Sequence, residues 1–168
     1  MSNYNEDTIA AVATAVGDGA ISIVRVSGKG SIELIDKVFS GKQKLIQAHS
    51  HTIHYGKISD PKGQIIDEVL AAVFKSPNSY TSEDMVEINC HGGWFVTNRM
   101  LQTILESGAR MAEPGEFTKR ALVNGRIDLV QAEAVADLIK ARSDLAHKAS
   151  ISQLEGKLSN KLININSQ

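Results

Sequence analysis

The hydrophobic pattern of the chain changes near residue 110, and this change limits the possible folds more than any other feature. Before it, short segments with the two-residue alternation of strands lie among helical patterns, whereas only helical periods follow it. The expected strands are 20–26, 51–58, 65–75 and 84–90. The order β-α-β-β-β-α, followed by helices alone, predicts an α+β fold.

Turn and capping residues mark where these elements begin and end. Asp60-Pro61-Lys62-Gly63 is strong turn chemistry and predicts a hairpin of the second and third strands. Ser31 is expected to cap a helix with an apolar stripe from Ile32 to Phe39. Gly108 is expected to end the helix that follows the last strand.

Beyond residue 112, Pro114-Gly115 predicts a short helix over 116–123, which Asn124-Gly125 ends. Asp128 and Gln131 have the spacing of a capping box. They predict one long helix over 128–149, with a weaker helical pattern to about residue 162.

Composition excludes several classes of protein. With 42% hydrophobic and 22% charged residues the chain should fold, and its net charge of -1 provides no basic face for gripping nucleic acid through phosphates. Its single cysteine allows no internal disulfide and fits a reducing compartment. Neither a secretory signal nor a transmembrane helix is evident, so a cytoplasmic location without membrane contact is expected.

Several catalytic or nucleotide-binding motifs fail on spacing. None of the Gly-Lys pairs, at 28–29, 41–42, 56–57 and 156–157, has the upstream glycine and the following Ser or Thr of a P-loop. His91-Gly92-Gly93 resembles an oxyanion-hole segment, but no G-x-S-x-G nucleophile accompanies it, so a turn from strand to helix is expected.

Histidine and cysteine chemistry is also disfavoured. His49, His51 and His54 divide between the two faces of a strand and have no neighbouring cysteine or carboxylate cluster, so no metal site is expected. Cys90 and His91 point to opposite faces, which makes a nucleophile and base pair unfavourable and a buried, structural cysteine the expectation.

Two charged residues lie on strand faces that otherwise look like core. Arg25 shares a face with Ile21 and Ile23, and Glu87 shares one with Met85 and Asn89. Burying a charged side chain on such a face costs free energy unless an opposite charge or a hydrogen-bond partner compensates it. Either the two residues form a structural ion pair or lie at a sheet edge, or they form a site for a polar ligand.

Taken together, a series of segments resembles the MnmE/TrmE family of tRNA-modifying GTPases. Each segment alone is a modest signal, but their common order along nearly the whole chain is specific. The segments are 7–11 (DTIAA), 19–28 (GAISIVRVSG), 79–84 (SYTSED), 87–93 (EINCHGG), 113–121 (EPGEFTKRA) and 124–139 (NGRIDLVQAEAVADLI).

The resemblance implies a fold and a function. Residues 1–115 would form a dimerising α/β domain with a mixed sheet, like the folate-binding domain of the glycine-cleavage aminomethyltransferase, and 116–168 would begin a helical domain. The family modifies carbon-5 of the wobble uridine in tRNA with a flavoprotein partner, MnmG (GidA). A tetrahydrofolate derivative, formyl or methylene, supplies the one-carbon unit. GTP, Mg²⁺ and K⁺ belong to a Ras-like GTPase domain that this sequence lacks.

By the same resemblance, three residues carry over as folate contacts, and none as catalytic. They are Arg25 in the IVRVSG strand, Glu87 before NCHGG, and Arg126 between Asn-Gly and Ile-Asp-Leu, where lysine is also common. Two other interpretations remain open. One is a pure dimerisation module in which Arg25 and Glu87 form an interface ion pair. The other is a free-standing protein like the aminomethyltransferase.

Overall fold

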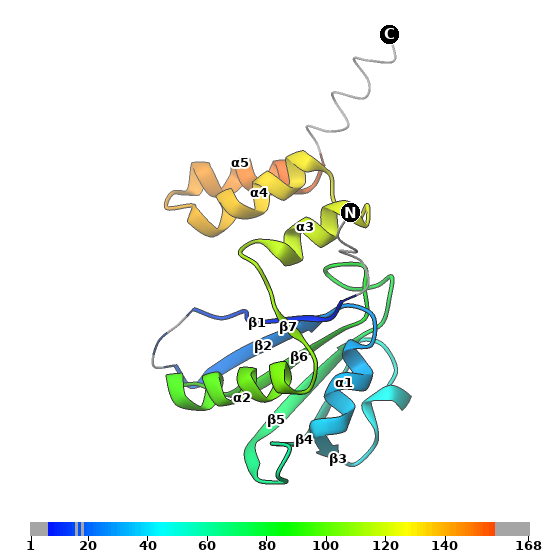
Figure 1. Ribbon diagram of the computed structural model, residues 1–168. Helices are drawn as coiled ribbons and strands as arrows, with labels where there is room; N and C mark the ends of the chain where they lie inside the picture. Colours follow the sequence, from blue (N-terminus) through cyan, green and yellow to red (C-terminus); the bar gives the residue numbers. More distant parts are fainter. Residues whose placement is uncertain (1–6, 16, 18, 157–168) are drawn as a thin grey trace. The chain divides into compact units, whose positions relative to one another are not determined.

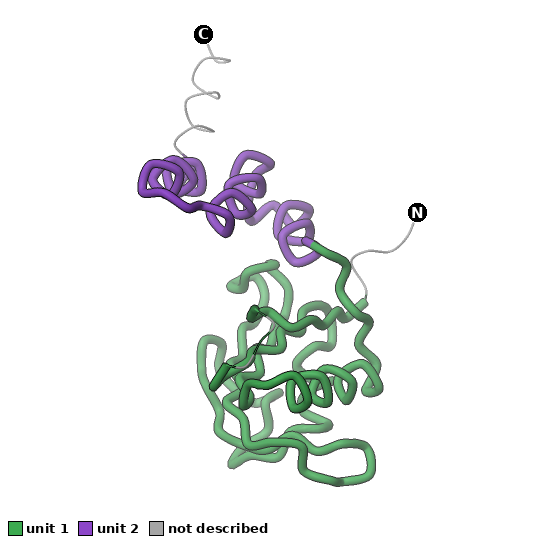
Figure 2. Tube along the Cα trace, turned by 90° about the vertical axis from the view of Figure 1, so that its left-hand side faces the viewer, with its two compact units in different colours: residues 1–114 green, residues 115–168 purple. Residues whose placement is uncertain are grey.

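Alternating hydrophobic residues in the first two thirds of the chain form a sheet, as their period requires. A computed structural model describes residues 7–15, 17 and 19–156. The chain divides into two units, 1–114 and 115–168, which Figure 2 colours separately and which are described one at a time below. The described residues form seven strands and five α-helices, so the predicted α+β fold is confirmed.

Unit 1 contains one mixed sheet in the order β3-β4-β5-β6-β2-β1-β7 (Figure 1). All neighbouring strands are antiparallel except β1 and β7, which are parallel. The strands are β1 (Ile9–Val12), β2 (Ile21–Ser27), β3 (Phe39–Gly41), β4 (Thr52–Ser59), β5 (Ile65–Phe74), β6 (Met85–His91) and β7 (Arg110–Met111). The predicted hairpin is therefore present as β4 and β5.

Two α-helices, α1 (Ser31–Val38) and α2 (Trp94–Glu106), pack on one face of this sheet, and a short 3-10 helix, Leu45–Gln47, follows β3. The core lies between the helices and this covered face. It joins residues of β2, β5 and β6 to residues of both helices: Val24, Val26, Val73, Val86, Ile88, Ile32, Ile35, Met100 and Ile104. Because strand side chains alternate, Arg25 and Glu87 lie on the opposite face, which carries no helix of unit 1.

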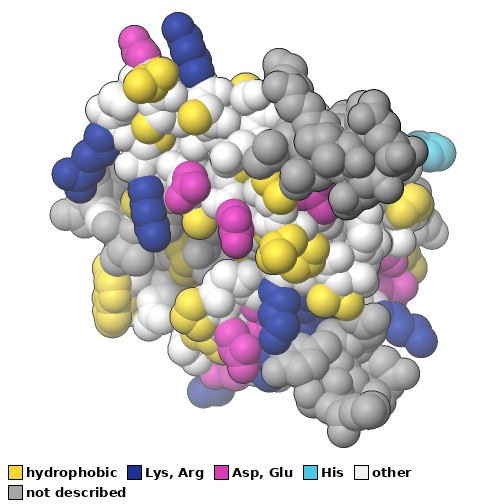
Figure 3. Space-filling view, turned by 90° about the horizontal axis from the view of Figure 1, so that it is seen from above, with side chains coloured by type: hydrophobic (Ala, Val, Ile, Leu, Met, Phe, Trp, Pro, Cys, Tyr) yellow, Lys and Arg dark blue, Asp and Glu magenta, His cyan; other side chains and the backbone are white. Residues whose placement is uncertain are grey.

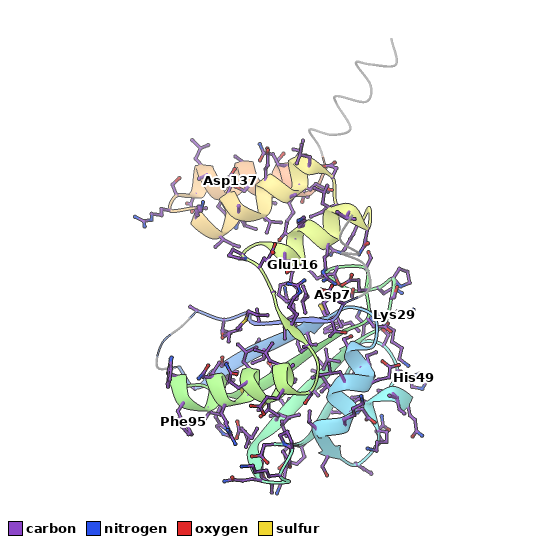
Figure 4. The ribbon with its side chains drawn as sticks, in the orientation of Figure 1. Asp7, Lys29, His49, Phe95, Glu116 and Asp137 are labelled. Atoms are coloured by element: carbon purple, nitrogen blue, oxygen red, sulfur yellow. The ribbon has the colours of Figure 1, made fainter. Side chains whose placement is uncertain are left out.

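The three shortest strands were not predicted from the sequence. β1, β3 and β7 have four, three and two residues, too few to show a period of two clearly. Tertiary pairing defines them instead: Arg110 Nε donates to Asp7 Oδ2 at 2.8 Å beside the β1–β7 pair. Figure 4 labels Asp7.

The start and end of α1 also differ from the prediction. Gly30, in the left-handed region at φ 84°, precedes the helix, and the Ser31 hydroxyl donates to the Asp84 carbonyl at 2.7 Å instead of capping α1. Phe39 belongs to β3 and not to the helical stripe. Its ring fills the space over the paired Gly41 and Gly56, where a Cβ on either glycine would lie within 2.6 Å of the ring. The sequence pattern could not distinguish an apolar residue ending a helix from one starting a strand.

Unit 2 is helical within the residues described. Its helices are α3 (Glu116–Val123), α4 (Leu129–Lys140) and α5 (Asp144–Leu154). The predicted helix over 116–123 and the Asp128–Gln131 capping box are confirmed. The single long helix is wrong, because the backbone leaves the helical conformation at Ala141, with a ψ of 128°. Ser143 then caps α5 by accepting from the Ala146 N–H at 3.2 Å. The pattern expected beyond residue 156 lies outside the described residues.

Candidate functional site

Arg25 and Glu87 meet on the helix-free face of the sheet. They are directly paired residues of the central strands β2 and β6. Arg25 Nε and Nη2 both donate to the same carboxylate oxygen, Glu87 Oε1, at 2.8 Å each. The side chains keep 25% and 20% of their surface exposed, so the pair is partly buried yet reachable from solvent. The structural pairing considered from the sequence is thus present.

Small neighbours leave space around this ion pair. Ala11 of β1 lies opposite Arg25, and Ala72 of β5 lies opposite Glu87. In an antiparallel pair, directly opposed side chains are the closest cross-strand neighbours. The small alanine side chains on the flanking strands β1 and β5 therefore leave room beside the charged pair.

A loop that precedes β6 supplies an aromatic ring to the site. The Arg25 guanidinium carbon lies 5.1 Å from the centre of the Tyr80 ring, within the range of a cation–π contact. The residues around Tyr80 are fixed: the Ser27 hydroxyl donates to Glu83 Oε2 at 2.8 Å and lies 2.6 Å from the hydroxyl of the buried Thr81. Tyr80 was not singled out from the sequence, since nothing in it relates residue 80 to residue 25.

The arrangement can bind a ligand that presents two hydrogen-bond donors side by side. Within the described residues Glu87 has Arg25 as its polar partner, and both contacts use Oε1. A carboxylate has about four acceptor positions over its two oxygens, so Oε2 and part of Oε1 remain available. Arg25 orients the carboxylate and balances its charge, and the Tyr80 ring offers a flat surface next to it.

Arg126 belongs to unit 2 and is described within that unit alone. It follows Gly125, which has a φ of 72°, and precedes the capping residue of α4. Its N–H donates to the Ala121 carbonyl at 2.9 Å, and its side chain is exposed. The structure therefore brings together two of the three residues assigned by resemblance and describes the third within its own unit.

The His91-Gly92-Gly93 segment is a strand-to-helix turn, as predicted. His91 ends β6 and Gly93, at φ 105°, precedes the first residue of α2. The Asp67 carboxylate accepts from both the N–H and Nδ1 of His91, at 2.7 and 2.8 Å, and fixes this end of β6.

Cys90 is buried, as predicted, and its Sγ lies 3.5 Å from the Ser22 carbonyl oxygen. Burial raises the pKa of the Cys90 thiol to about 11. At neutral pH the thiolate, which is the reactive form, is scarce.

The described residues contain no cluster of three or more His, Cys, Asp or Glu residues able to hold a metal ion. None of their helices is long and apolar enough to cross a membrane.

The fold and the polar pair define a class: an α+β domain with a candidate small-ligand site on its sheet, joined to a helical unit. Comparison of the sequence with known families is more specific. The family described as "GTP-binding protein TrmE N-terminus" matches residues 8–126, and the chain belongs to this family.

Curated relatives agree with that assignment. The chain is 58% identical over 161 residues to the "tRNA modification GTPase MnmE" of Geobacillus thermodenitrificans (strain NG80-2), 94% of this chain and 34% of the relative. It is 58% identical over 158 residues to the protein of that name in Bacillus mycoides (strain KBAB4), with the same coverage. It is 56% identical over 157 residues to that of Lactobacillus acidophilus (strain ATCC 700396), covering 93% and 34%. The chain thus spans about a third of the length of these relatives.

Proposed function

We propose that this chain is the reduced-folate-binding and dimerisation module of a GTPase that modifies carbon-5 of wobble uridine in tRNA. Residues 1–115 would bind the folate and dimerise, and 116–168 would begin the helical domain. The ligand would be a formyl or methylene tetrahydrofolate, and the flavoprotein MnmG (GidA) would be the catalytic partner. Family membership supports the tRNA-modification context.

The single observation that carries the folate proposal is the geometry of Glu87. A pterin ring presents a ring N–H and an exocyclic amino group side by side, and an ionised carboxylate matches this edge with two acceptors. Glu87 is held at one oxygen by Arg25, and the other oxygen has no partner within the described residues. Arg126 is proposed to contact the polar or anionic remainder of the ligand.

Calorimetric titration of the chain with 5-formyltetrahydrofolate tests this proposal. The matched control is p-aminobenzoylglutamate, which has the tail of a folate but no pterin. We expect saturable binding of the folate and none of the control at the same concentrations. Equal binding of both compounds would contradict the proposal that Glu87 accepts hydrogen bonds from the pterin. If neither compound binds, the chain is better explained as a pure dimerisation module.

We propose homodimerisation through the helix-free face of the sheet. Ile53, Tyr55 and Leu70 of β4 and β5 form a patch there and expose 66%, 61% and 46% of their surface. A two-fold dimer would bury the same patch on both copies. Leu70→Lys should therefore weaken association, whereas Phe95→Lys, an exposed control on α2, should not. Sedimentation equilibrium that finds the unaltered chain monomeric at tens of micromolar would contradict this proposal.

Contact with tRNA is assigned to other parts of the complete enzyme. The net charge of the chain is -1. Figure 3 shows acidic and basic side chains interspersed on the face that it displays, with no continuous basic area. We therefore propose that most of the phosphate contacts, which dominate affinity for nucleic acid, come from elsewhere.

A further inference from the structure

Unit 1 has a cavity beside the β4–β5 turn, where the start of β5 meets α2. Its volume is about 440 Å³, which falls in the range of small-molecule sites. Residues of the turn, of β5 and of α2 line it: Asp60, Gln64, Ile65, Ile66, Phe95, Val96 and Arg99. The cavity shares no residue with the proposed folate site at Arg25 and Glu87.

Arg99 is the cationic group of this cavity, and a buried carboxylate holds it in place. Arg99 Nη2 donates to Asp60 Oδ2 at 2.7 Å. The Asp60 side chain exposes 3% of its surface, whereas that of Arg99 exposes 46%. Asp60 Oδ1 accepts from the N–H groups of Lys62 and Gln64 at 2.9 Å each. The carboxylate is therefore fixed by the turn, and it orients a guanidinium that solvent can still reach.

Hydrogen-bond donors remain available at this oriented guanidinium. A guanidinium carries several N–H donors in a planar fork. Within the described residues the Arg99 side chain makes one hydrogen bond, that to Asp60, and the Gln64 side chain makes none. A second carboxylate can therefore bind along the edge of the guanidinium that Asp60 leaves open, with the Gln64 amide as a further donor.

The other walls of the cavity are apolar and unusually exposed. Phe95 of α2, which Figure 4 labels, exposes 74% of its surface, and Ile65 of β5 exposes 55%. Ile66 and Val96 are half-buried beside them. Covering such side chains removes apolar surface from water, which is favourable. A ligand that fits the cavity therefore carries an apolar body next to its charged group.

We infer that this cavity binds a small apolar carboxylate. The carboxylate accepts from the Arg99 guanidinium and the Gln64 amide, and the apolar body packs on Phe95 and Ile65. A carboxylate brings a single charge and matches the planar guanidinium with two oxygens. A phosphate monoester brings a charge of about −1.5 to −2, which an arginine already paired with Asp60 offsets less well.

Three probes with one apolar body and different polar ends test this inference. The 168-residue chain is titrated with 4-phenylbutyrate, the uncharged 4-phenylbutyramide and 3-phenylpropyl phosphate, and the backbone amide shifts of residues 64–66 and 95–99 are followed by NMR. We expect saturable shifts with 4-phenylbutyrate, weaker binding of the phosphate and no saturation with the amide. Equal binding of the amide, tighter binding of the phosphate, or no saturable shift with 4-phenylbutyrate would overturn the inference.

Two variants with matched controls assign the contacts. Arg99→Lys keeps a charge for Asp60 but removes the planar fork, and it should weaken 4-phenylbutyrate binding roughly 3-fold or more. Phe95→Ala removes an exposed apolar wall and should weaken binding by a similar factor. Arg142→Lys and Leu145→Ala, at exposed residues of α5 and the segment before it, should leave binding unchanged. Effects equal to those of the controls would overturn the inference. If Arg99→Lys does not fold, Phe95→Ala decides it alone.

Discussion

Gly92 lies where two backbone segments approach each other closely. Its N–H donates to the Ala20 carbonyl at 3.0 Å, and a Cβ built on it would lie 1.9 Å from the Gly19 oxygen. No side chain can occupy that space without displacement of the segment before β2. A glycine is thus required at residue 92 by this approach and not by its own backbone angles.

Gly92→Ala should accordingly lower the free energy of unfolding by about 1–3 kcal/mol, as overpacking of a close contact does. Gly17→Ala is the control, because nothing lies within 4 Å of a Cβ at that residue. Urea unfolding of both variants measures the difference. A Gly92→Ala protein as stable as the Gly17→Ala protein would show that the close approach is not kept in solution.

Cys90 should resist thiol reagents in the folded chain. With a thiol pKa of about 11, roughly one molecule in a thousand carries the thiolate at pH 8, and the sulfur is also buried. We expect slow reaction with a disulfide reagent under native conditions and rapid reaction in urea. Comparable rates in the two conditions would mean that β6 opens readily.

The β4–β5 turn is held by the side chain of Asp60. Asp60 Oδ1 accepts from the N–H groups of Lys62 and Gln64, at 2.9 Å each, and Asp60 Oδ2 accepts from Arg99 of α2 at 2.7 Å. The pKa of Asp60 lies below its usual 3.8 because the carboxylate accepts backbone hydrogen bonds from Gln64 and Lys62 and lies beside the Arg99 guanidinium. One carboxylate therefore forms the turn and joins it to the helix on the covered face.

A group whose pKa is lowered by folding stabilises the folded state at pH values above its unfolded pKa. This stabilisation is lost as the pH falls through the folded value. Asp60→Asn should therefore be less stable than the unaltered chain at neutral pH, and the difference should shrink as the pH falls below about 4. Urea unfolding across this range measures it, with Glu33→Gln on α1 as an exposed control. A difference that stays constant with pH would contradict the assignment.

Long elements with their own start and stop signals could be predicted from the sequence. The β4–β5 hairpin, α3 and the capping box of α4 all follow from local residues. The short β1, β3 and β7 could not, because partners far away in the sequence define them. The break between α4 and α5 has no Gly or Pro; a hydrogen bond from Gln131 to the Leu154 carbonyl, at 2.7 Å, joins the two helices as a hairpin.

The candidate site could likewise be predicted from the sequence only in part. Charge on a core-like strand face drew attention to Arg25 and Glu87 separately, and the sheet register, which the sequence does not show, makes them direct partners. Tyr80 depends on a loop whose position is fixed by hydrogen bonds to Ser27. Arg126 rests on family resemblance alone.

For the whole molecule, the chain alone should not bind GTP. None of its four Gly-Lys pairs has P-loop spacing, and the relatives are about three times as long. Calorimetric titration with GTP and Mg²⁺ should show no saturable heat. Saturable binding would mean that the nucleotide is held by a different arrangement of backbone N–H groups.

The central proposal, a pterin-binding carboxylate at Glu87, is tested most directly by Glu87→Gln with two quantities measured on one protein. Glutamine keeps the shape but replaces one acceptor with a donor, which would face a donor of the pterin. We expect 5-formyltetrahydrofolate affinity to fall by about 2 kcal/mol or more, roughly 30-fold at least, with little change in Tm. Glu68→Gln on β5, whose carboxylate pairs with Lys57 at 3.3 Å, is the control and should bind normally. Unchanged folate affinity with a lowered Tm would instead make Arg25 and Glu87 a structural ion pair.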